Sequence, residues 1–548
     1  MKKILILCIV AVMSLISGCG SDSADNDLKV MLGSNVVSLD TAKAVDLSSF
    51  EVIADCIDGL MQLDSNGKEI PAIAESFDVS EDGKTYTFHL RDAKWANGDD
   101  VTADDFVFAW RRHCQKADEY SYIMGSTVAC VKNADAVIKG ADPKTLGVSA
   151  PDPKTFVVEL DSTVSFFPSL MCFPVFYPIN EKFYNGLENG TYGTSPETFL
   201  SNGAFVLTSY VPGSANIQLK KNDTYWNAEK VSLDKFQYQI VSSSDNALTA
   251  FKNGTMNVVE ISGNQVEHVK KDDGLSKNLK VVPSGLLSYV SFNQDSKNHH
   301  AGALANSNLR LAISNAIDRE SLVSNYVMDG SEATYTAIPL QFAPNAETGK
   351  FFAEDQQQFS DYVGFNVDKA RQYLETAKSE LNKDKFELNL IYANDSGDTI
   401  VKVVQAIKSQ VEENLPGVTL NLQPMPKAEY LSHVTSNSYD IAVTNWAPDY
   451  DDPMTFFTLW TTEGSEIAEH WSNSEYDKII SDCTTGELST DYEARWNAMY
   501  DAEKILLENA VIAPLYTNVT ATLMSDNVTG IDFHSVAVPR VYKSVKIK

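Results

Sequence analysis

Residues that could bind a ligand gather in the stretch 439–457, YDIAVTNWAPDYDDPMTFF. Its apolar start, 441–443, predicts a buried strand, which is followed by Trp446 and then by an acidic turn that begins at Asp449. The backbone of a strand can pair with an extended ligand, a carboxylate can bind an amine, and an indole can cover a side chain. None of these groups performs a reaction by itself. The stretch therefore predicts a site that holds a short peptide.

Plainer interpretations of the same residues compete with this prediction. Asp449 could be a solvated acid that caps the segment after the turn, and Trp446 could be a core residue, the commoner fate of a tryptophan after an apolar strand. Together with Asp451 and Asp452, Asp449 could also suggest calcium. The turn lacks the glycine and the distal glutamate of a calcium-binding loop, so we expect no metal ion there.

Charge and motifs exclude other classes of function. The formal net charge of −30 repels phosphate backbones, so we expect no nucleic-acid partner. The sequence contains no Gly-x-Ser-x-Gly, no His-Glu-x-x-His and no P-loop. We therefore expect a protein that is not an enzyme, with a secreted hydrolase as a remote alternative. His299 and His300 are metal ligands by type, but their polar surroundings favour a solvated loop. We expect no cofactor.

The N-terminus has the features of an export signal. Two lysines precede an apolar run, 4–16, that is shorter than the roughly 20 residues needed to span a bilayer. The following LISGC sequence resembles a bacterial lipobox, in which the cysteine becomes the lipidated first residue. We expect a signal peptide at 1–18, a lipid on Cys19 and a flexible polar tether over 19–27. A plain secretory signal with a chance cysteine is the alternative.

Five cysteines remain once Cys8 and Cys19 are set aside. Because five is odd, at least one thiol is unpaired, and the spacing fits no zinc site. Cys114 and Cys130 are a candidate disulfide pair. Buried free thiols are the favoured interpretation, since a large core does not need covalent staples.

Strands and helices alternate along the rest of the chain. At 548 residues it is long enough for roughly three or four domain-sized units. Strands are expected at 28–32, 85–90, 155–160, 203–210, 217–221, 258–261, 288–293, 386–392 and 418–422. Helices are expected within 46–63, from Thr102 onward, and at 246–251, 308–323, 368–381, 399–415 and 491–509. This alternation predicts an α/β body with crossover connections.

Eight short motifs follow one another along the chain. They are IDGL at 57–60, AESF at 74–77, DGKTYTFHLR at 82–91, WANGD at 95–99, VTADDF at 101–106, KNDTYW at 221–226, LRLAISNAIDRE at 309–320 and WAPDY at 446–450. In this order they resemble the extracytoplasmic solute-binding proteins of peptide ABC transporters, the oligopeptide- and dipeptide-binding family. Each motif is weak alone, and the ordered set is specific.

The resemblance implies an α/β fold like that of the periplasmic binding proteins, with two main lobes joined by a hinge and an inserted third lobe. Lobe I would comprise 28–61, 200–287 and 515–548, lobe II would be the insertion 62–199, and lobe III would be 288–514. The two crossings between lobes I and III would form the hinge. The ligand would lie in the cleft between these two lobes.

The resemblance also implies which residues bind the ligand. In this family the acid of the Trp-x-x-Asp motif binds the terminal ammonium of a peptide, the strand before it pairs with the peptide backbone, and a segment of the other lobe faces it. The residues implied here are Asp449, then Asn445, Trp446 and Ala447, and, by a looser match, Leu47, Ser48 and Ser49. Arginines that some members place near the peptide carboxylate are replaced by Val434 and Val443. The preferred peptide length therefore does not follow from the motif.

The family implies a lipid-anchored monomer at the outer face of the cytoplasmic membrane. It would capture short peptides and deliver them to the permease subunits of an ABC importer. Two alternatives keep the fold and change the role: a binder of nickel, haem or an oligosaccharide, and a receptor for peptide pheromones.

Overall fold

The structure is a computed structural model that describes residues 28–116, 120–295, 301–345, 348–355, 359–395, 397–462 and 470–548. The predicted signal peptide, Cys19, the tether, and the pair His299 and His300 lie outside the described residues.

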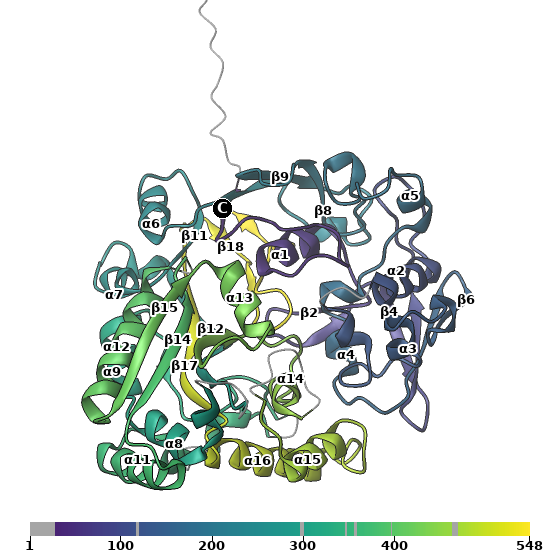
Figure 1. Cartoon of the computed structure of the whole chain (residues 1–548). Coiled ribbons are helices and arrows are strands. Elements are labelled where there is room, and N and C mark those ends of the chain that lie inside the picture. Colours follow the sequence, from purple (N-terminus) through teal and green to yellow (C-terminus); the bar gives the residue numbers. More distant parts are fainter. Residues whose placement is uncertain are drawn as a thin grey trace, which may run out of the picture.

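One sheet of eleven strands runs through the molecule (Figure 1). Its order is β15-β14-β16-β12-β17-β11-β1-β10-β9-β8, with β13 beside β17. The strands are β1 (Leu28–Leu32), β8 (Phe205–Ser209), β9 (Asn216–Lys221), β10 (Lys235–Ile240), β11 (Val258–Ile261), β12 (Leu279–Phe292), β13 (Glu332–Ala333), β14 (Phe386–Ala393), β15 (Val418–Met425), β16 (Ile441–Trp446) and β17 (Ile512–Met524). Parallel and antiparallel pairs both occur, as expected of a mixed α/β sheet.

The long antiparallel strands β12 and β17 join the two halves of this sheet. One end of the β12–β17 pair lies against β11 and the other end against β16. The pairing of β12 with β17 is interrupted between Pro283 and Leu287. Gly285 lies in this gap with φ +72°, a conformation that favours glycine. The crossings that the resemblance predicts, at 287/288 and 514/515, therefore fall within β12 and β17.

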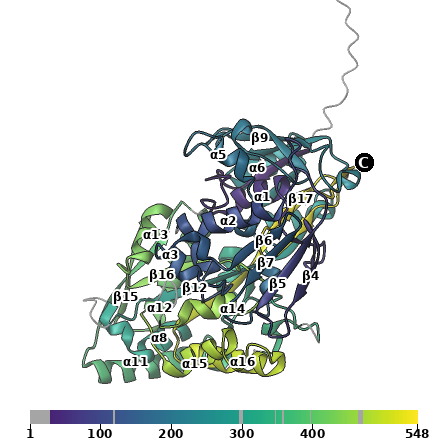
Figure 2. The same ribbon diagram turned by 90° about the vertical axis from the view of Figure 1, so that its right-hand side faces the viewer.

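A separate four-stranded antiparallel sheet belongs to the segment 62–199. Its order is β4-β5-β7-β6, with β4 at Ala74–Val79, β5 at Thr85–Leu90, β6 at Val148–Asp152 and β7 at Thr155–Glu159. The helix α2 (Ala103–Lys116) packs on β6 and β7. Figure 1 places this sheet to one side of the main sheet, and Figure 2 shows it from that side.

Helices and short strand pairs cover the sheets. The remaining α-helices are α1 (Leu47–Cys56), α3 (Ala134–Ile138), α4 (Phe167–Leu170), α5 (Glu181–Asn185), α6 (Ser244–Lys252), α7 (Asn264–Lys270), α8 (Ser307–Asn315), α9 (Arg319–Leu322), α10 (Ser360–Val363), α11 (Val367–Leu381), α12 (Asp398–Asn414), α13 (Lys427–Thr435), α14 (Met454–Phe457), α15 (Ser474–Thr484) and α16 (Tyr492–Glu508). The short strand pairs are β2 (Met61–Leu63) with β3 (Glu69–Pro71), β18 (Val528–Thr529) with β21 (Lys546–Ile547), and β19 (Asp532–Phe533) with β20 (Arg540–Val541). No helix among the described residues is long and apolar enough to cross a membrane.

Most predicted strands and helices are confirmed with small shifts at their ends, but the helix within 46–63 is shorter than its pattern indicated. It ends at Cys56, and the last three residues of the stretch form β2 instead. The backbone N–H of Asp58 donates to Oδ1 of Asn202, at 2.8 Å. A partner distant in the sequence thus replaces the next helical hydrogen bond.

The helix predicted at 308–323 is divided into α8 and α9. The carboxylate of Asp318 accepts the backbone N–H of Ser321 at 3.0 Å, so it caps the start of α9. The apolar spacing was helical throughout, but the cap at Asp318 starts a new helix within it.

All five described cysteines, Cys56, Cys114, Cys130, Cys172 and Cys483, are free and buried. Burial raises the pKa of the Cys114 thiol to about 12 and that of the Cys130 thiol to about 12. The two thiols of the candidate disulfide pair are therefore part of the core.

Candidate ligand-binding site

The acidic turn after β16 is held in place by a buried ion pair. Both guanidinium nitrogens Nη1 and Nη2 of Arg495, on α16, donate to the carboxylate of Asp452 at 2.8 Å. The same carboxylate accepts the backbone N–H of Met454 at 2.9 Å, at the start of α14. Asp452 thus has a structural role, and the turn it fixes carries Asp449.

The carboxylate of Asp449 is buried, and no cation among the described residues pairs with it. Asp449 is 8% exposed, and its Oδ2 accepts a hydrogen bond of 2.6 Å from the hydroxyl of Tyr122. Burial raises the pKa of Asp449 to about 6, and the Tyr122 hydrogen bond only partly offsets that effect. No ion pair involves Asp449 among the described residues. A buried carboxylate in this state is stabilised by an incoming cation.

Tyr122 was missed by the sequence analysis. It lies on a short 3-10 helix, Ser121–Met124, within the inserted segment 62–199, and is separated from Asp449 by 327 positions. Its side chain remains 37% exposed, so it also stays accessible to a ligand. No motif or periodicity marks this tyrosine, and only the fold brings it to the acid.

Two further contacts join the acidic turn to the inserted segment. The rings of Tyr450 and Phe166 stack with centroids 4.3 Å apart and an interplanar angle of 8°. The backbone N–H of Asp451 donates to Oγ of Ser169 at 3.2 Å. Asp449 therefore lies at a boundary between parts of the chain that are distant in sequence.

Beyond Ala442, one edge of β16 has no strand partner among the described residues, and the carbonyl of Val443 accepts the hydroxyl of Tyr430 at 3.1 Å. On one side β16 pairs with β12 as far as Trp446, whereas on the other it pairs with β14 only at Ile441 and Ala442. Asn445, in the part without a second strand partner among the described residues, is exposed. An edge of this kind can accept an extended peptide as an added strand.

Trp446 and Ala447 are half-buried at the end of this edge. Trp446 packs against the hydrophobic core, which fits the plainer interpretation of this residue in part. Its indole Nε1 is buried and makes no hydrogen bond within the described part of the chain. Trp446 thus has an apolar face in the core and an unused donor.

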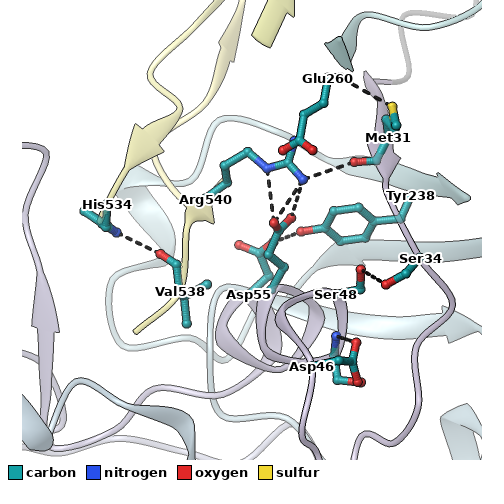
Figure 3. Close-up of polar contacts among 12 residues, drawn as sticks. Met31, Ser34, Asp46, Ser48, Asp55, Tyr238, Glu260, His534, Val538 and Arg540 are labelled. Atoms are coloured by element: carbon teal, nitrogen blue, oxygen red, sulfur yellow. Dashed lines mark hydrogen bonds and ion pairs between the residues drawn. The ribbon is translucent and has the colours of Figure 1, made fainter. Parts of the chain in front are cut away.

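A cavity of about 240 Å³ separates the end of β16 from the start of α1. Ala447 and Pro448 line it from one side, and Leu47 and Ser48 line it from the other. Leu47 is 43% exposed, and the hydroxyls of Ser48 and Ser34 lie 3.0 Å apart (Figure 3). The fold therefore brings the segment at 47–48 opposite the strand end.

Ser49 is fully buried, whereas Leu47 is 43% exposed and Ser48 keeps 8% of its surface exposed. Its hydroxyl donates to Oδ2 of Asp46 at 2.5 Å and accepts the backbone N–H groups of Val37 and Ser38 at 3.0 and 3.2 Å. These bonds occupy the hydroxyl. The expectation that Ser49 contacts the ligand is therefore corrected: Ser49 positions the segment that carries Leu47 and Ser48.

Charged residues form the inner wall of this cavity. Arg540 donates to the carboxylate of Glu51 at 2.9–3.1 Å and lies 2.9 Å from the carboxylate of Glu260 (Figure 3 shows Arg540 and Glu260). Burial raises the pKa of Glu51 to about 8, although the Arg540 charge acts in the opposite direction. Burial likewise raises the pKa of the adjacent Asp55, which accepts from Tyr238 at 2.6 Å, to about 6.

A larger cavity of about 910 Å³ lies against the other side of the acidic turn. Phe166, Phe342 and Trp496 contribute aromatic walls, and Asp451 contributes a carboxylate whose pKa is raised to about 7, by burial first and then by the charge of Glu69. None of the predicted ligand-binding residues lines this cavity. Among the described residues, no group of three or more His, Cys, Asp or Glu side chains is placed to hold a metal ion.

Comparison with known proteins identifies the family to which the chain belongs. The profile described as "Bacterial extracellular solute-binding proteins, family 5 Middle" matches residues 68–466. The chain belongs to this family. The resemblance to extracytoplasmic solute-binding proteins and the α/β binding-protein fold are thus confirmed.

Members of the family resemble the chain over almost its whole length. The "Dipeptide-binding protein" of Lactococcus lactis is 30% identical over 554 aligned positions, which cover 97% of each chain. The substrate-binding domain of an oligopeptide ABC transporter from Bacillus anthracis is 33% identical, with a TM-score of 0.83 and coverage of 96% of this chain and 99% of that one. The structure "Listeria monocytogenes OppA bound to peptide" is 29% identical, with a TM-score of 0.81 and coverage of 96% and 100%.

Proposed function

We propose that this solute-binding protein captures short peptides between its lobes and delivers them to the permease of an ABC importer. Two of the three similar proteins described above are named for dipeptide or peptide binding, and the third for an oligopeptide transporter. The protein acts as a monomer, held at the outer face of the cytoplasmic membrane by a lipid on Cys19. It binds and releases its ligand without a cofactor and without catalysis.

The observation that supports a peptide ligand is the buried carboxylate of Asp449. It has one neutral hydrogen-bond donor, Tyr122, and no cation within the described chain. The terminal ammonium of a peptide supplies the missing charge and three N–H donors. Every peptide with a free N-terminus has this group, so the contact is strong without selecting a sequence.

The unpaired backbone edge at the end of β16 provides the second contact with the peptide. Asn445, Trp446 and Ala447 can pair with the first residues of an extended peptide, since this edge has no second strand partner in the described chain. The half-buried indole of Trp446 offers its ring as an apolar wall for a ligand side chain. Leu47 and Ser48 face the same space from the other side.

The proposed mechanism is closure of lobe I (28–61, 200–287 and 515–548) and lobe III (288–514) over the peptide, with lobe II (62–199) contributing Tyr122. Ligand contacts to more than one lobe favour the closed arrangement over the open one. The interruption of β12 at Gly285 is a suitable place for bending, because backbone pairing is already broken there.

The experiment that tests this proposal compares two ligands that differ only at the amine. Trialanine and N-acetyl-trialanine are titrated by calorimetry into protein freed of copurified ligand by unfolding and refolding. We expect acetylation to weaken binding by at least about 30-fold, because loss of the ammonium leaves a buried carboxylate unpaired. Equal affinities would remove the assignment of Asp449. Binding of nickel, haem or an oligosaccharide in place of both peptides would favour a different solute.

A further inference from the structure

The charged wall of the 240 Å³ cavity contains two carboxylates and one guanidinium. Arg540 Nε and Nη2 bind Glu51, and Nη1 lies 2.9 Å from Oε1 of Glu260. Glu260 is the polar exception in β11, whose other residues, Val258, Val259 and Ile261, are buried apolar side chains. Its carboxylate pairs with Arg540 through Oε1 and also borders the cavity.

The three charged side chains differ in access to the cavity. The side chains of Glu51 and Arg540 are each 3% exposed, whereas that of Glu260 is 33% exposed. His534 also lines the cavity, but its two ring nitrogens lie 3.2 and 2.9 Å from the backbone oxygens of Val538 and Asp64. A molecule in the cavity therefore meets the negative charge of Glu260 first.

The remaining wall is suited to a hydrated polar group. Hydroxyl side chains line the cavity from several elements: Ser34, Ser48, Ser284, Ser535 and Thr520. A water molecule takes about 30 Å³, so the volume admits the stem of a long side chain together with a few waters. Glu260 can bind some of the N–H groups of a cation. Hydroxyl groups and bridging waters can accept hydrogen bonds from the remaining N–H groups.

The position of the cavity indicates which ligand residue reaches it. Ala447 and Pro448 line it, and Pro448 directly precedes Asp449. Successive residues of an extended chain are about 3.3 Å apart. A peptide whose ammonium lies at Asp449 therefore brings the side chain of its first or second residue to the cavity.

We propose that this cavity is a side-chain subsite that prefers lysine or arginine at one of the first two peptide positions, with Glu260 as the partner of the cation. The inference rests on the proposed function. An acidic side chain would face Glu260 across the cavity, while Arg540 is already paired with two carboxylates. An apolar side chain would remove water from Glu260 without replacing its hydrogen bonds.

The test uses tetra-alanine peptides that carry lysine or norleucine at position 1, 2 or 3, titrated by calorimetry. Norleucine has the lysine stem without the amine. We expect lysine to bind up to about fivefold more tightly than norleucine at position 1 or 2, and equally at position 3, because a partly exposed ion pair contributes at most about this factor. Glu260→Gln abolishes the preference, and Glu260→Asp, which keeps the charge, retains it.

A matched control separates the subsite from the overall negative charge. Glu387, on β14, is exposed, and Glu387→Gln removes the same charge away from the cavity. This variant should keep the lysine preference. If Glu260→Gln does not fold, the wild-type protein still decides: glutamate at the preferred position should bind more weakly than glutamine, by up to about fivefold.

Different failures are distinguishable. Failure of every alanine-based peptide to bind would overturn the proposed function. Binding of tetra-alanine without any lysine preference would overturn the subsite alone. A preference at position 3 only, or one that survives Glu260→Gln, would also refute it.

Discussion

Replacing Asp449 with asparagine should weaken peptide binding and, at neutral pH, stabilise the ligand-free protein. Asparagine keeps the shape of the side chain and can still accept the Tyr122 hydroxyl, which lies 2.6 Å from Oδ2 of Asp449. It removes the buried charge. The two effects have opposite signs because the charge is costly in the absence of a ligand and necessary for binding an ammonium.

The magnitude follows from the pKa of Asp449, which burial raises from 3.8 to about 6. Two pKa units correspond to about 3 kcal/mol, which is the upper bound on the gain in unfolding free energy for Asp449→Asn above pH 6. A carboxyl group with a raised pKa in the folded state destabilises the protein in its ionised form. The gain therefore shrinks as the pH falls from 6 and vanishes below about pH 4.

Thermal unfolding of ligand-free protein at pH 4 and pH 7.5 measures this effect, and calorimetry with trialanine measures binding. We expect a higher Tm for Asp449→Asn at pH 7.5, no difference at pH 4, and an affinity loss of about 2–5 kcal/mol at pH 7.5. In the wild-type protein, affinity for trialanine should fall as the pH drops below about 6, because Asp449 becomes protonated.

Tyr122→Phe is the matched control for this variant. It retains the Asp449 charge and removes its hydrogen-bond donor, so the ligand-free protein should become less stable at pH 7.5. An unchanged or lower Tm for Asp449→Asn at pH 7.5, or an unchanged affinity for trialanine, would refute the reasoning.

Three further substitutions test the structure that holds the site. Arg495→Met leaves the buried carboxylate of Asp452 unpaired and should lower the unfolding free energy by about 3–5 kcal/mol, measured by denaturant titration; a stability equal to wild type would contradict the role of the pair. Gly285→Ala places a Cβ 2.9 Å from Pro448 and should weaken trialanine binding as well as stability, which calorimetry and Tm would show together. Arg310→Met removes the donor to three backbone carbonyl groups and should lower the unfolding free energy by at least about 2 kcal/mol. It should have no direct effect on affinity for trialanine. A loss of binding at unchanged stability would contradict this expectation.

The local pattern of the sequence was sufficient for most secondary structure and for the position of β16. The apolar run before Trp446 predicted this strand, and the residues after it predicted a turn, because alternation and turn residues act over a few positions. The same local reasoning failed after Cys56, where the backbone N–H of Asp58 donates to the side chain of Asn202 in place of a helical carbonyl. A partner 144 residues away leaves no local signal.

The roles of the individual acids could not be separated by sequence reasoning. Asp449 and Asp452 are three residues apart, and both looked like turn acids. In the structure Asp452 is paired with Arg495, whereas the carboxylate of Asp449 accepts a hydrogen bond from the Tyr122 hydroxyl and pairs with no cation among the described residues. That difference depends on which distant helix or loop packs against each side of the turn.

By itself, the sequence determined the alternation of strands and helices, the family and the strand that precedes Asp449, because periodicity and ordered motifs are properties of the chain. Only the tertiary structure decided that Asp449 meets Tyr122, that Ser49 is an internal support, and that Glu51, Glu260 and Arg540 form one wall of a cavity. Tyr122 and Asp449 are 327 residues apart, and Glu51 and Arg540 are 489 residues apart. The strength of their electrostatic interactions and hydrogen bonds is set by folding, which removes water and fixes the distances between the groups.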